Sequence, residues 1–295
     1  MEWTLKKLLD WATEYFQKRG IDSPRLNAEL LLGRALDLNR VALYVQFDRP
    51  MNEAELAAFK SLVQRRAARE PLAYILGERE FYSLKFKVGP AVLIPRPETE
   101  ELVERGLGFL RGLATENPRT LDIATGSGCI PIALLKNHPG LSAVAFDASA
   151  EALALAASNA AALGVDPRLS LQLLDFHGPW PAWAKGPFDL ITANPPYVAE
   201  AEWLGLEPEV REAEPKTALV PGPSGLEAYE VLLPQIPARL KSPGLALFEI
   251  GAGQGPSLLG LAARLCPELR AEIQPDLAGR DRFLALQRDL PNQPA

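Results

Sequence analysis

The sequence predicts an α/β fold, in which helices cover both faces of a mostly parallel β-sheet and a small helical domain precedes it. Three observations predict this fold. Beyond Pro97, short apolar runs alternate with helical stretches, which is the pattern of strand-helix-strand units. A glycine-rich turn follows the first of these runs. The first 70 residues, in contrast, place their apolar side chains at helical spacing.

The N-terminal part is expected to form several short helices. Thr4 can cap a first helix that ends near Gly20, and Ser23-Pro24 places a cap residue before a proline at the start of a second. A shorter helix is expected over residues 40–47, and Asn52 opens a further one. Together these segments predict a compact helical domain.

Three arginines lie near the end of that last helix, at Arg65, Arg66 and Arg69. Two interpretations remain open for them. They form either a solvated helix face or a contact for an acidic patch on a protein partner.

The remaining sequence predicts a connector followed by a sheet. Residues 81–88 alternate with period two and end at Gly89-Pro90, as a strand of a hairpin does. Strands are expected at 120–124, 141–146, 169–174, 188–193 and 244–250, and helices at 149–163 and 226–240. The predicted domains are therefore a helical substrate-recognition domain (1–78), a hairpin linker (79–97) and an α/β domain (98–295).

Composition excludes several classes of protein. The longest run without a charged residue is 14 residues, shorter than the ~18 that a membrane-spanning helix needs. Two cysteines and two histidines cannot build a disulfide framework or a zinc cage, so no metal is expected. The net charge of −6 argues against stable nucleic-acid binding. The N-terminus shows no secretory signal pattern, so we expect a cytoplasmic protein, and a monomer.

The first predicted strand runs into the turn Ala124-Thr125-Gly126-Ser127-Gly128, directly after Asp122-Ile123. Such a turn brings backbone N–H groups to the carboxyl edge of the sheet, where open α/β folds bind nucleotide-like ligands. The dinucleotide fingerprint needs a third glycine where this chain has Pro131, so NAD and FAD are disfavoured. An ordinary strand-helix turn is the alternative.

Acidic residues follow the next two strands. Asp147 lies about 20 residues after the glycines, where a carboxylate can accept the two hydroxyls of a ribose. Asp175 and Phe176 offer a carboxylate and a flat ring to an adenine. Each aspartate alone could instead cap a helix or face solvent, but the three cues at successive strand ends favour a nucleoside site.

The fourth strand ends in Asn194-Pro195-Pro196-Tyr197. The two prolines remove two N–H donors, which leaves the Asn194 side chain and a main-chain carbonyl as acceptors beside an aromatic ring. Such a set suits a planar NH₂ group. Asn194, Pro195 and Tyr197 are therefore the candidate catalytic residues, and with Pro196 they form the candidate substrate clamp.

These motifs resemble S-adenosylmethionine-dependent methyltransferases that act on planar nitrogens. The similarity is closer to the bacterial peptide chain release factor glutamine methyltransferase family, PrmC/HemK, whose further signatures occur at residues 70–77, 94–100, 214–219, 249–251 and 276–282. The chain departs from that family at Ala124, where glycine is usual, and at Phe176, where tryptophan is common. Neither change removes a group that the chemistry needs.

The resemblance implies a Rossmann-like class I S-adenosylmethionine methyltransferase sheet and methyl transfer to the side-chain amide of the glutamine in the Gly-Gly-Gln loop of class 1 release factors. S-adenosylhomocysteine is the implied product. The implied cofactor residues are Asp122, Ala124, Thr125, Gly126, Ser127, Gly128, Asp147, Asp175, Phe176 and Asn194.

Two rival functions remain. An adenine-N6 DNA or RNA methyltransferase would use the same clamp on a flipped base, and it should show a basic groove. The charge balance is +3 before Pro95 and −9 from there on, which opposes this rival. A binding or scaffold protein on the same fold is the second rival, although it would be expected to lose the clamp or the acidic anchors.

Overall fold

The computed structural model describes residues 3–289, and these divide into two compact units. The helical unit runs up to Glu78 and also includes a later segment, Glu207–Ala213. The sheet unit contains Arg79–Leu206 and the chain from Glu214 onward. The expected linker, 79–97, therefore belongs to the sheet unit. Positions 1–2 and 290–295 of the expected domains lie outside the described residues.

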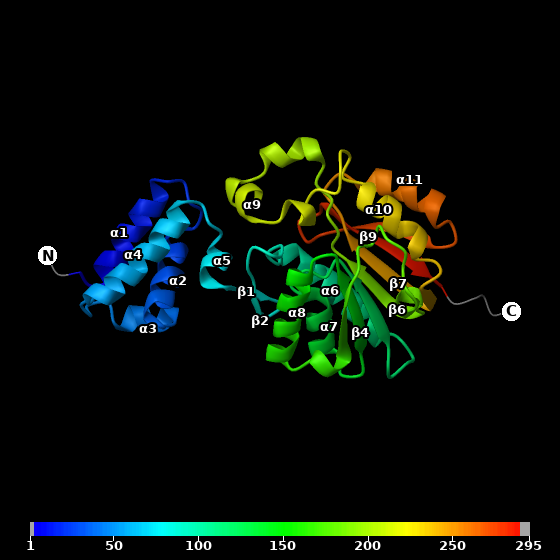
Figure 1. The fold of residues 1–295 in the computed structure, drawn as a ribbon, viewed down its shortest axis with the longest axis horizontal. Coiled ribbons are helices and arrows are strands. Elements are labelled where there is room, and N and C mark those ends of the chain that lie inside the picture. The colour runs from blue at the N-terminus through cyan, green and yellow to red at the C-terminus, as the bar shows by residue number, and fades with distance from the viewer. Residues whose placement is uncertain (1–2, 290–295) are drawn as a thin grey trace. The chain divides into compact units, whose positions relative to one another are not determined.

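The helical unit (Figure 1) forms because three of its helices begin at side-chain caps and its helices share a buried apolar core. Its helices are α1 (Leu5–Gln17), α2 (Pro24–Leu36), α3 (Arg40–Val45), α4 (Glu53–Ala67), α5 (Leu72–Leu76) and the later α9 (Pro208–Ala213). Thr4 caps α1, and Asn52 forms a capping box with Glu55 at α4. Phe16, Leu31 and Phe59 lie in the shared core.

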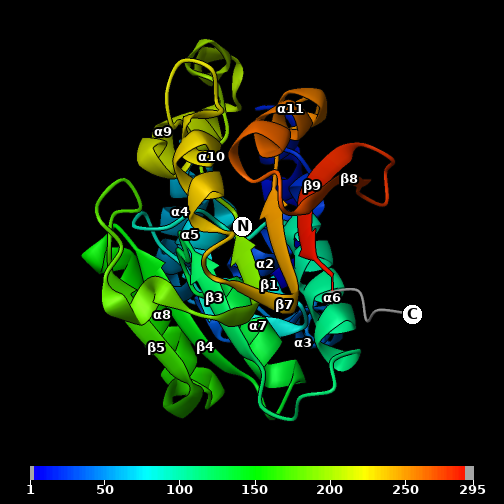
Figure 2. The same cartoon turned by 90° about the vertical axis from the view of Figure 1, so that its right-hand side faces the viewer.

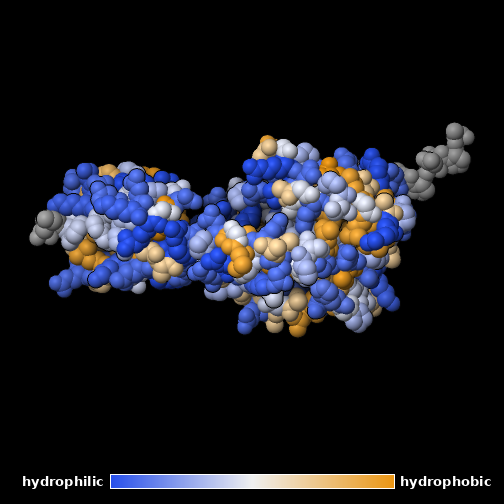
Figure 3. Space-filling view, turned by 90° about the horizontal axis from the view of Figure 1, so that it is seen from above, coloured by the Kyte–Doolittle hydropathy of each residue, from blue (hydrophilic) through white to orange (hydrophobic). Residues whose placement is uncertain are grey.

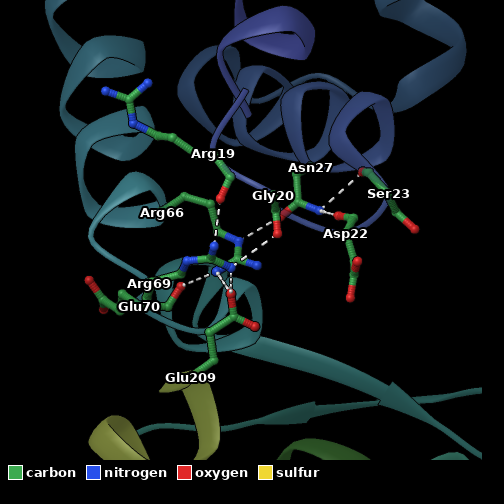
Figure 4. Close-up of polar contacts among 9 residues, drawn as sticks. All are labelled: Arg19, Gly20, Asp22, Ser23, Asn27, Arg66, Arg69, Glu70 and Glu209. Carbon is green, nitrogen blue, oxygen red and sulfur yellow. Dashed lines mark hydrogen bonds and ion pairs between the residues drawn. The ribbon is translucent and has the colours of Figure 1, made fainter. Parts of the chain in front are cut away.

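The arginines at the end of α4 are bound within the helical unit (Figure 4). The side chain of Arg66 is buried and donates to Asn27 Oδ1 at 2.7 Å and to Glu209 Oε1 at 2.9 Å. Arg69 also donates to Glu209 Oε1, at 3.3 Å. Because Arg66 is buried and forms an ion pair with Glu209 of the same unit, neither the solvated-face nor the partner-contact interpretation holds for it.

The sheet unit contains a seven-stranded sheet of order β5-β4-β3-β6-β7-β9-β8 (Figure 2). Its strands are β3 (Arg119–Ile123), β4 (Ser142–Asp147), β5 (Leu169–Leu173), β6 (Phe188–Ala193), β7 (Leu240–Glu249), β8 (Arg270–Pro275) and β9 (Asp281–Arg288). The first five run parallel, and β9 pairs antiparallel with both β7 and β8. The five predicted strands are present, while β8 and β9 were not predicted.

Helices cover both faces of this sheet, which confirms the predicted fold class. One face packs on α6 (Pro97–Arg111), α7 (Cys129–Asn137) and α8 (Ala150–Leu163), and the other on α10 (Glu227–Leu232) and α11 (Gly255–Leu265). Adjacent strand residues alternate between the faces, as Leu190 and Ile191 do. The helix predicted at 226–240 is shorter than expected, because α10 ends at Leu232 and a 3-10 turn that contains Pro234 follows it.

A two-stranded hairpin stands at the start of the sheet unit, with β1 at Glu78–Phe81, whose first residue belongs to the helical unit, and β2 at Leu84–Lys87. The expectation of one strand over 81–88 is wrong, because a turn interrupts it. Tyr82 and Ser83 have φ of 50° and 58°, the left-handed conformation that two-residue hairpin turns require.

Hydrophobic residues on the drawn face of the surface form separate groups between hydrophilic ones (Figure 3). Within residues 3–289, no helix is both long and apolar enough to cross a membrane.

Candidate functional site

A cavity of about 600 Å³ lies in the sheet unit at the carboxyl ends of the parallel strands. The segments that follow β3, β4, β5 and β6 all contribute to its wall, together with residues before and at the start of α6 and residues from 215–221. This edge is where the fold gathers the ends of strands that are distant in sequence. The cavity is large enough for a nucleoside-sized ligand.

The glycine-rich turn forms one wall of the cavity. Gly126 and Gly128 have φ of 54° and 78°, and Ala124 has φ of 55°. A Cβ at Gly128 would lie 2.9 Å from Ile132 Cδ1 and 3.1 Å from Ala156 Cβ, so this glycine permits close packing on α7 and α8. A Cβ at Gly126 would meet nothing within 4 Å, so the turn leaves open space there.

Asp122 lies at the base of the turn and is fully buried. Its Oδ1 accepts a hydrogen bond of 2.6 Å from Thr192 Oγ1 on β6. Burial raises the pKa of Asp122 to about 7, and the nearby charge of Asp147 adds to the rise. Ser127 is also buried, and it lines the cavity with Thr125.

Asp147, at the end of β4, lines the cavity and holds the turn in place. Its Oδ2 accepts the Gly126 N–H at 2.9 Å, and its Oδ1 accepts the Ser149 N–H at 2.9 Å. The carboxylate therefore joins two of the loops that surround the cavity. Each oxygen keeps a second lone pair for a ligand.

Asp175 and Phe176 line the same cavity, after β5. Asp175 Oδ1 accepts from the backbone N–H of His177 and lies 2.9 Å from His177 Nδ1. These contacts lower the pKa of Asp175. The His177 ring packs against Phe176 in a tilted arrangement with a centroid distance of 4.4 Å, and it lines the cavity too, close to the predicted adenine region.

The Asn-Pro-Pro-Tyr segment enters the site from β6. Asn194 and Pro196 line the cavity, whereas Pro195 and Tyr197 do not. Asn194 Nδ2 donates to Thr99 Oγ1 at 3.3 Å. The Tyr197 hydroxyl donates to Glu249 Oε1 at 3.3 Å, and burial raises its pKa above the usual range. The structure thus places Asn194 at the cavity and Tyr197 behind it.

Two buried glutamates accept hydrogen bonds from residues at the cavity and hold them in place. Glu249, at the end of β7, accepts the Thr99 hydroxyl at 2.6 Å, and burial raises its pKa. Glu214 accepts the Ile94 N–H at 3.0 Å and Arg96 Nη2 at 2.6 Å. The sequence assigned no role to either glutamate.

Glu98 is exposed in the first turn of α6 and does not line the cavity, whereas its neighbours Arg96 and Thr99 do.

Among residues 3–289, no group of three or more histidine, cysteine or acidic side chains is arranged to hold a metal ion.

Known proteins match both units of the chain. Residues 7–77 match the family described as PrmC N-terminal domain, and residues 107–206 match the methyltransferase small domain. The release factor glutamine methyltransferase of Geobacter sulfurreducens is 45% identical over 89% of this chain and 89% of its own length. That of Nitratidesulfovibrio vulgaris is 42% identical over 97% of this chain and 96% of its own length.

The chain belongs to the release factor glutamine methyltransferase family. A solved structure of the hMettl16 catalytic domain is 18% identical with a TM-score of 0.54, and covers 79% of this chain and 84% of that one. At that identity the likeness shows the fold alone. Family membership agrees with the resemblance that the motifs indicated, and it extends over both units.

Proposed function

We propose that this protein transfers a methyl group from S-adenosylmethionine to the side-chain amide nitrogen (N5) of the glutamine in the Gly-Gly-Gln loop of class 1 peptide chain release factors. The observation that carries this proposal is the shared cavity. Asn194 lines the same cavity as the glycine turn, Asp147 and Phe176, so a nucleoside ligand and a planar amide can meet there. Membership in the release factor glutamine methyltransferase family supports the substrate.

The cavity residues fit S-adenosylmethionine. Thr125 and Ser127 line the cavity and bring hydroxyl groups to its wall. The open space at Gly126 admits a ligand against the backbone. Asp147 is assigned to the ribose and Asp175 with Phe176 to the adenine. When bound, S-adenosylmethionine supplies an electrophilic methyl group on a sulfonium centre.

The role of the clamp is to align a poor nucleophile. An amide nitrogen has its lone pair delocalised into the carbonyl, so orientation and polar preorganisation must supply much of the rate. In our proposal the Asn194 Oδ1 and the Pro195 carbonyl accept the two amide hydrogens. Tyr197, predicted to flank the amide, lies behind the cavity and holds the segment through its hydrogen bond to Glu249. No general base is required, because the methylated nitrogen is acidic and can release its proton to water.

The central experiment is a radiolabelled methyl-transfer assay with three acceptors, which are unmodified release factor, DNA and ribosomal RNA. We expect label only in the release factor, and on its Gly-Gly-Gln glutamine. Label in adenine of either nucleic acid would establish the rival function and overturn the proposal.

The helical unit is assigned to recognition of the protein substrate, because one glutamine loop offers less than the ~800 Å² per partner of a standard interface. Because release factors act on ribosomes, we propose that the enzyme is cytoplasmic. On α3, Val41 and Val45 are 73% and 80% exposed. Charged substitutions at both should lower kcat/KM about tenfold on intact release factor but not on a short Gly-Gly-Gln peptide. An equal effect on both substrates would contradict this assignment.

A further inference from the structure

A chain of hydrogen bonds runs from the cavity into the core of the sheet unit. Asn194 Nδ2 donates to Thr99 Oγ1 at 3.3 Å, and Thr99 Oγ1 donates to Glu249 Oε2 at 2.6 Å. The three residues come from the end of β6, the first turn of α6 and the end of β7. Thr99 and Glu249 are 2% and 1% exposed, so water does not compete for these groups.

The number of available protons determines which atom donates in each hydrogen bond of this chain. An ionised carboxylate can only accept, and a hydroxyl has a single proton to donate. Because Thr99 gives that proton to Glu249, its oxygen offers only lone pairs to Asn194. The Asn194 atom that faces Thr99 must therefore be the donor, Nδ2, and the acceptor, Oδ1, faces away from it.

We infer that Thr99 and Glu249 are positioning residues for the proposed methyl transfer, which fix the Asn194 carboxamide so that Oδ1 is presented to the substrate amide. Among residues 3–289, Asn194 Oδ1 has no hydrogen-bond partner, so it is available to the cavity that Asn194 lines. The reversed carboxamide would present an NH₂ group to a substrate NH₂ group. Two donors cannot bond to each other, so the reversed orientation is inactive.

The second oxygen of Glu249 extends the arrangement to the other end of the clamp. Tyr197 donates its hydroxyl to Oε1 at 3.3 Å. The Glu249 carboxylate therefore holds both ends of the Asn-Pro-Pro-Tyr segment, because it binds Tyr197 directly and Asn194 through Thr99. The Tyr229 hydroxyl on α10 donates to the main-chain carbonyl of Glu249 at 2.6 Å and fixes the end of β7.

The direction of the hydrogen bonds from Asn194 to Thr99 and from Thr99 to Glu249 also depends on the charge of Glu249. A protonated Glu249 could donate to Thr99, which would free the Thr99 proton for Asn194 Oδ1 and allow the carboxamide to reverse. Burial raises the pKa of Glu249, while Thr99, Arg282 and Tyr197 oppose that rise. The titratable or charged groups that interact with Glu249 are Glu98 on α6, Cys129 on α7, Tyr197 after β6, Tyr229 on α10 and Arg282 on β9.

The test uses the full-length enzyme, and it rests on the proposed function. The wild-type enzyme is therefore first assayed on release factor, DNA and ribosomal RNA, so that a failure of the proposed function is seen before any variant is made. Thr99→Val then removes the hydroxyl and keeps the shape of the side chain. We expect kcat on release factor to fall about tenfold, with the dissociation constant for S-adenosylmethionine unchanged within about twofold.

Two further variants separate positioning from structural support. Thr99→Ser restores the hydroxyl and should recover most of kcat. Thr120→Val is the matched control, since Thr120 is fully buried on β3 and, within the described chain, its hydroxyl has no hydrogen-bond partner. It should leave kcat unchanged. A Thr99→Val enzyme with wild-type kcat, or a loss of kcat that Thr99→Ser does not recover, overturns the inference.

The pH dependence of kcat gives an independent measurement. In the wild-type enzyme kcat should fall on acidification, as Glu249 takes up a proton. Glu249→Gln has no titratable group at this position, so its pH profile should lack this fall of kcat at acidic pH, the acid limb. An acid limb that persists unchanged in Glu249→Gln contradicts the role of Glu249.

Discussion

Two buried glutamates, one in each unit, show opposite ways to keep a carboxylate out of water. Glu29 in the helical unit and Glu249 in the sheet unit are each 1% exposed. Burial disfavours the charge of Glu29, but hydrogen bonds from Tyr44, Arg40 and Arg25 outweigh it and lower the pKa. Glu249 receives its side-chain hydrogen bonds from the neutral hydroxyls of Thr99 and Tyr197, and its pKa is raised.

The two carboxylates contribute differently to the stability of the fold. Glu29 joins Arg25 on α2 to Arg40 on α3, at 2.9 and 2.7 Å, so it holds helices together. The charge of Glu249 is unfavourable for folding, because no cation forms an ion pair with it among the described residues. A fold that retains such a group stores an unfavourable interaction at a site where function needs it.

The largest effect is expected at the paired glutamate. Glu29→Ala removes the carboxylate that Arg25 and Arg40 share, while Arg25 keeps its ion pair with Asp10. It should lower the free energy of unfolding by about 3 kcal/mol, the low end for a buried pair because both arginines reach solvent. Chemical denaturation measures this loss. Glu14→Ala, which breaks an exposed pair with Lys18, is the control and should cost less than about 0.5 kcal/mol. Equal losses of unfolding free energy in the two variants would show that Glu29 stabilises the protein no more than an exposed ion pair does.

The next effect is on turnover. Asn194→Ala removes the group that Thr99 and Glu249 hold, so kcat should fall about 10²-fold while stability and S-adenosylmethionine binding change little. Steady-state kinetics and calorimetry measure the two separately. Near-normal turnover would show that the clamp does not orient the amide.

Asp122 is a second carboxylate without a cationic partner among residues 3–289, and it should give the ligand-free enzyme a pH-dependent stability. Its folded pKa of about 7 is raised above the unfolded value of 3.8, so the stabilisation is fully present below pH 3.8 and is lost as pH rises toward 7. Between pH 5 and 7 the wild-type enzyme should lose about 2 kcal/mol more than Asp122→Asn. Denaturant titrations at the two pH values measure the difference, and parallel curves would refute it.

The smallest effect is expected at Ala124, whose φ of 55° is a conformation that glycine adopts without strain. Ala124→Gly should stabilise the sheet unit by up to about 1 kcal/mol. A shift in the thermal unfolding temperature measures it. A loss of stability would mean that the Ala124 side chain contributes packing that outweighs its backbone strain.

Local patterns predicted the parallel strands and the residues at their ends. The turn at 124–128, Asp147, Asp175 and Asn194 could be recognised because each follows an apolar run directly. The strands β8 and β9 were missed, since charged and polar residues interrupt both.

The supporting residues could not be found in this way. Thr99 and Glu249 lie in recognised motifs, but they are 150 residues apart, and only the folded sheet unit brings them together. The burial of Arg66 could not be predicted for the same reason, because its carboxylate partner, Glu209, lies 143 residues later.

The place of Glu209 in the chain also sets an order of events during synthesis. The buried apolar core of the helical unit is complete once Ile75 has been made, yet Arg66 must wait for Glu209, which follows Arg66 by 143 residues. At ribosomal rates of about 5–20 residues per second, that delay is roughly 7 to 30 s. During this interval Asn27 and the Glu70 carbonyl are left to hold a buried guanidinium without a neutralising charge. The nascent helical unit is thus finished only after most of the sheet unit has left the ribosome.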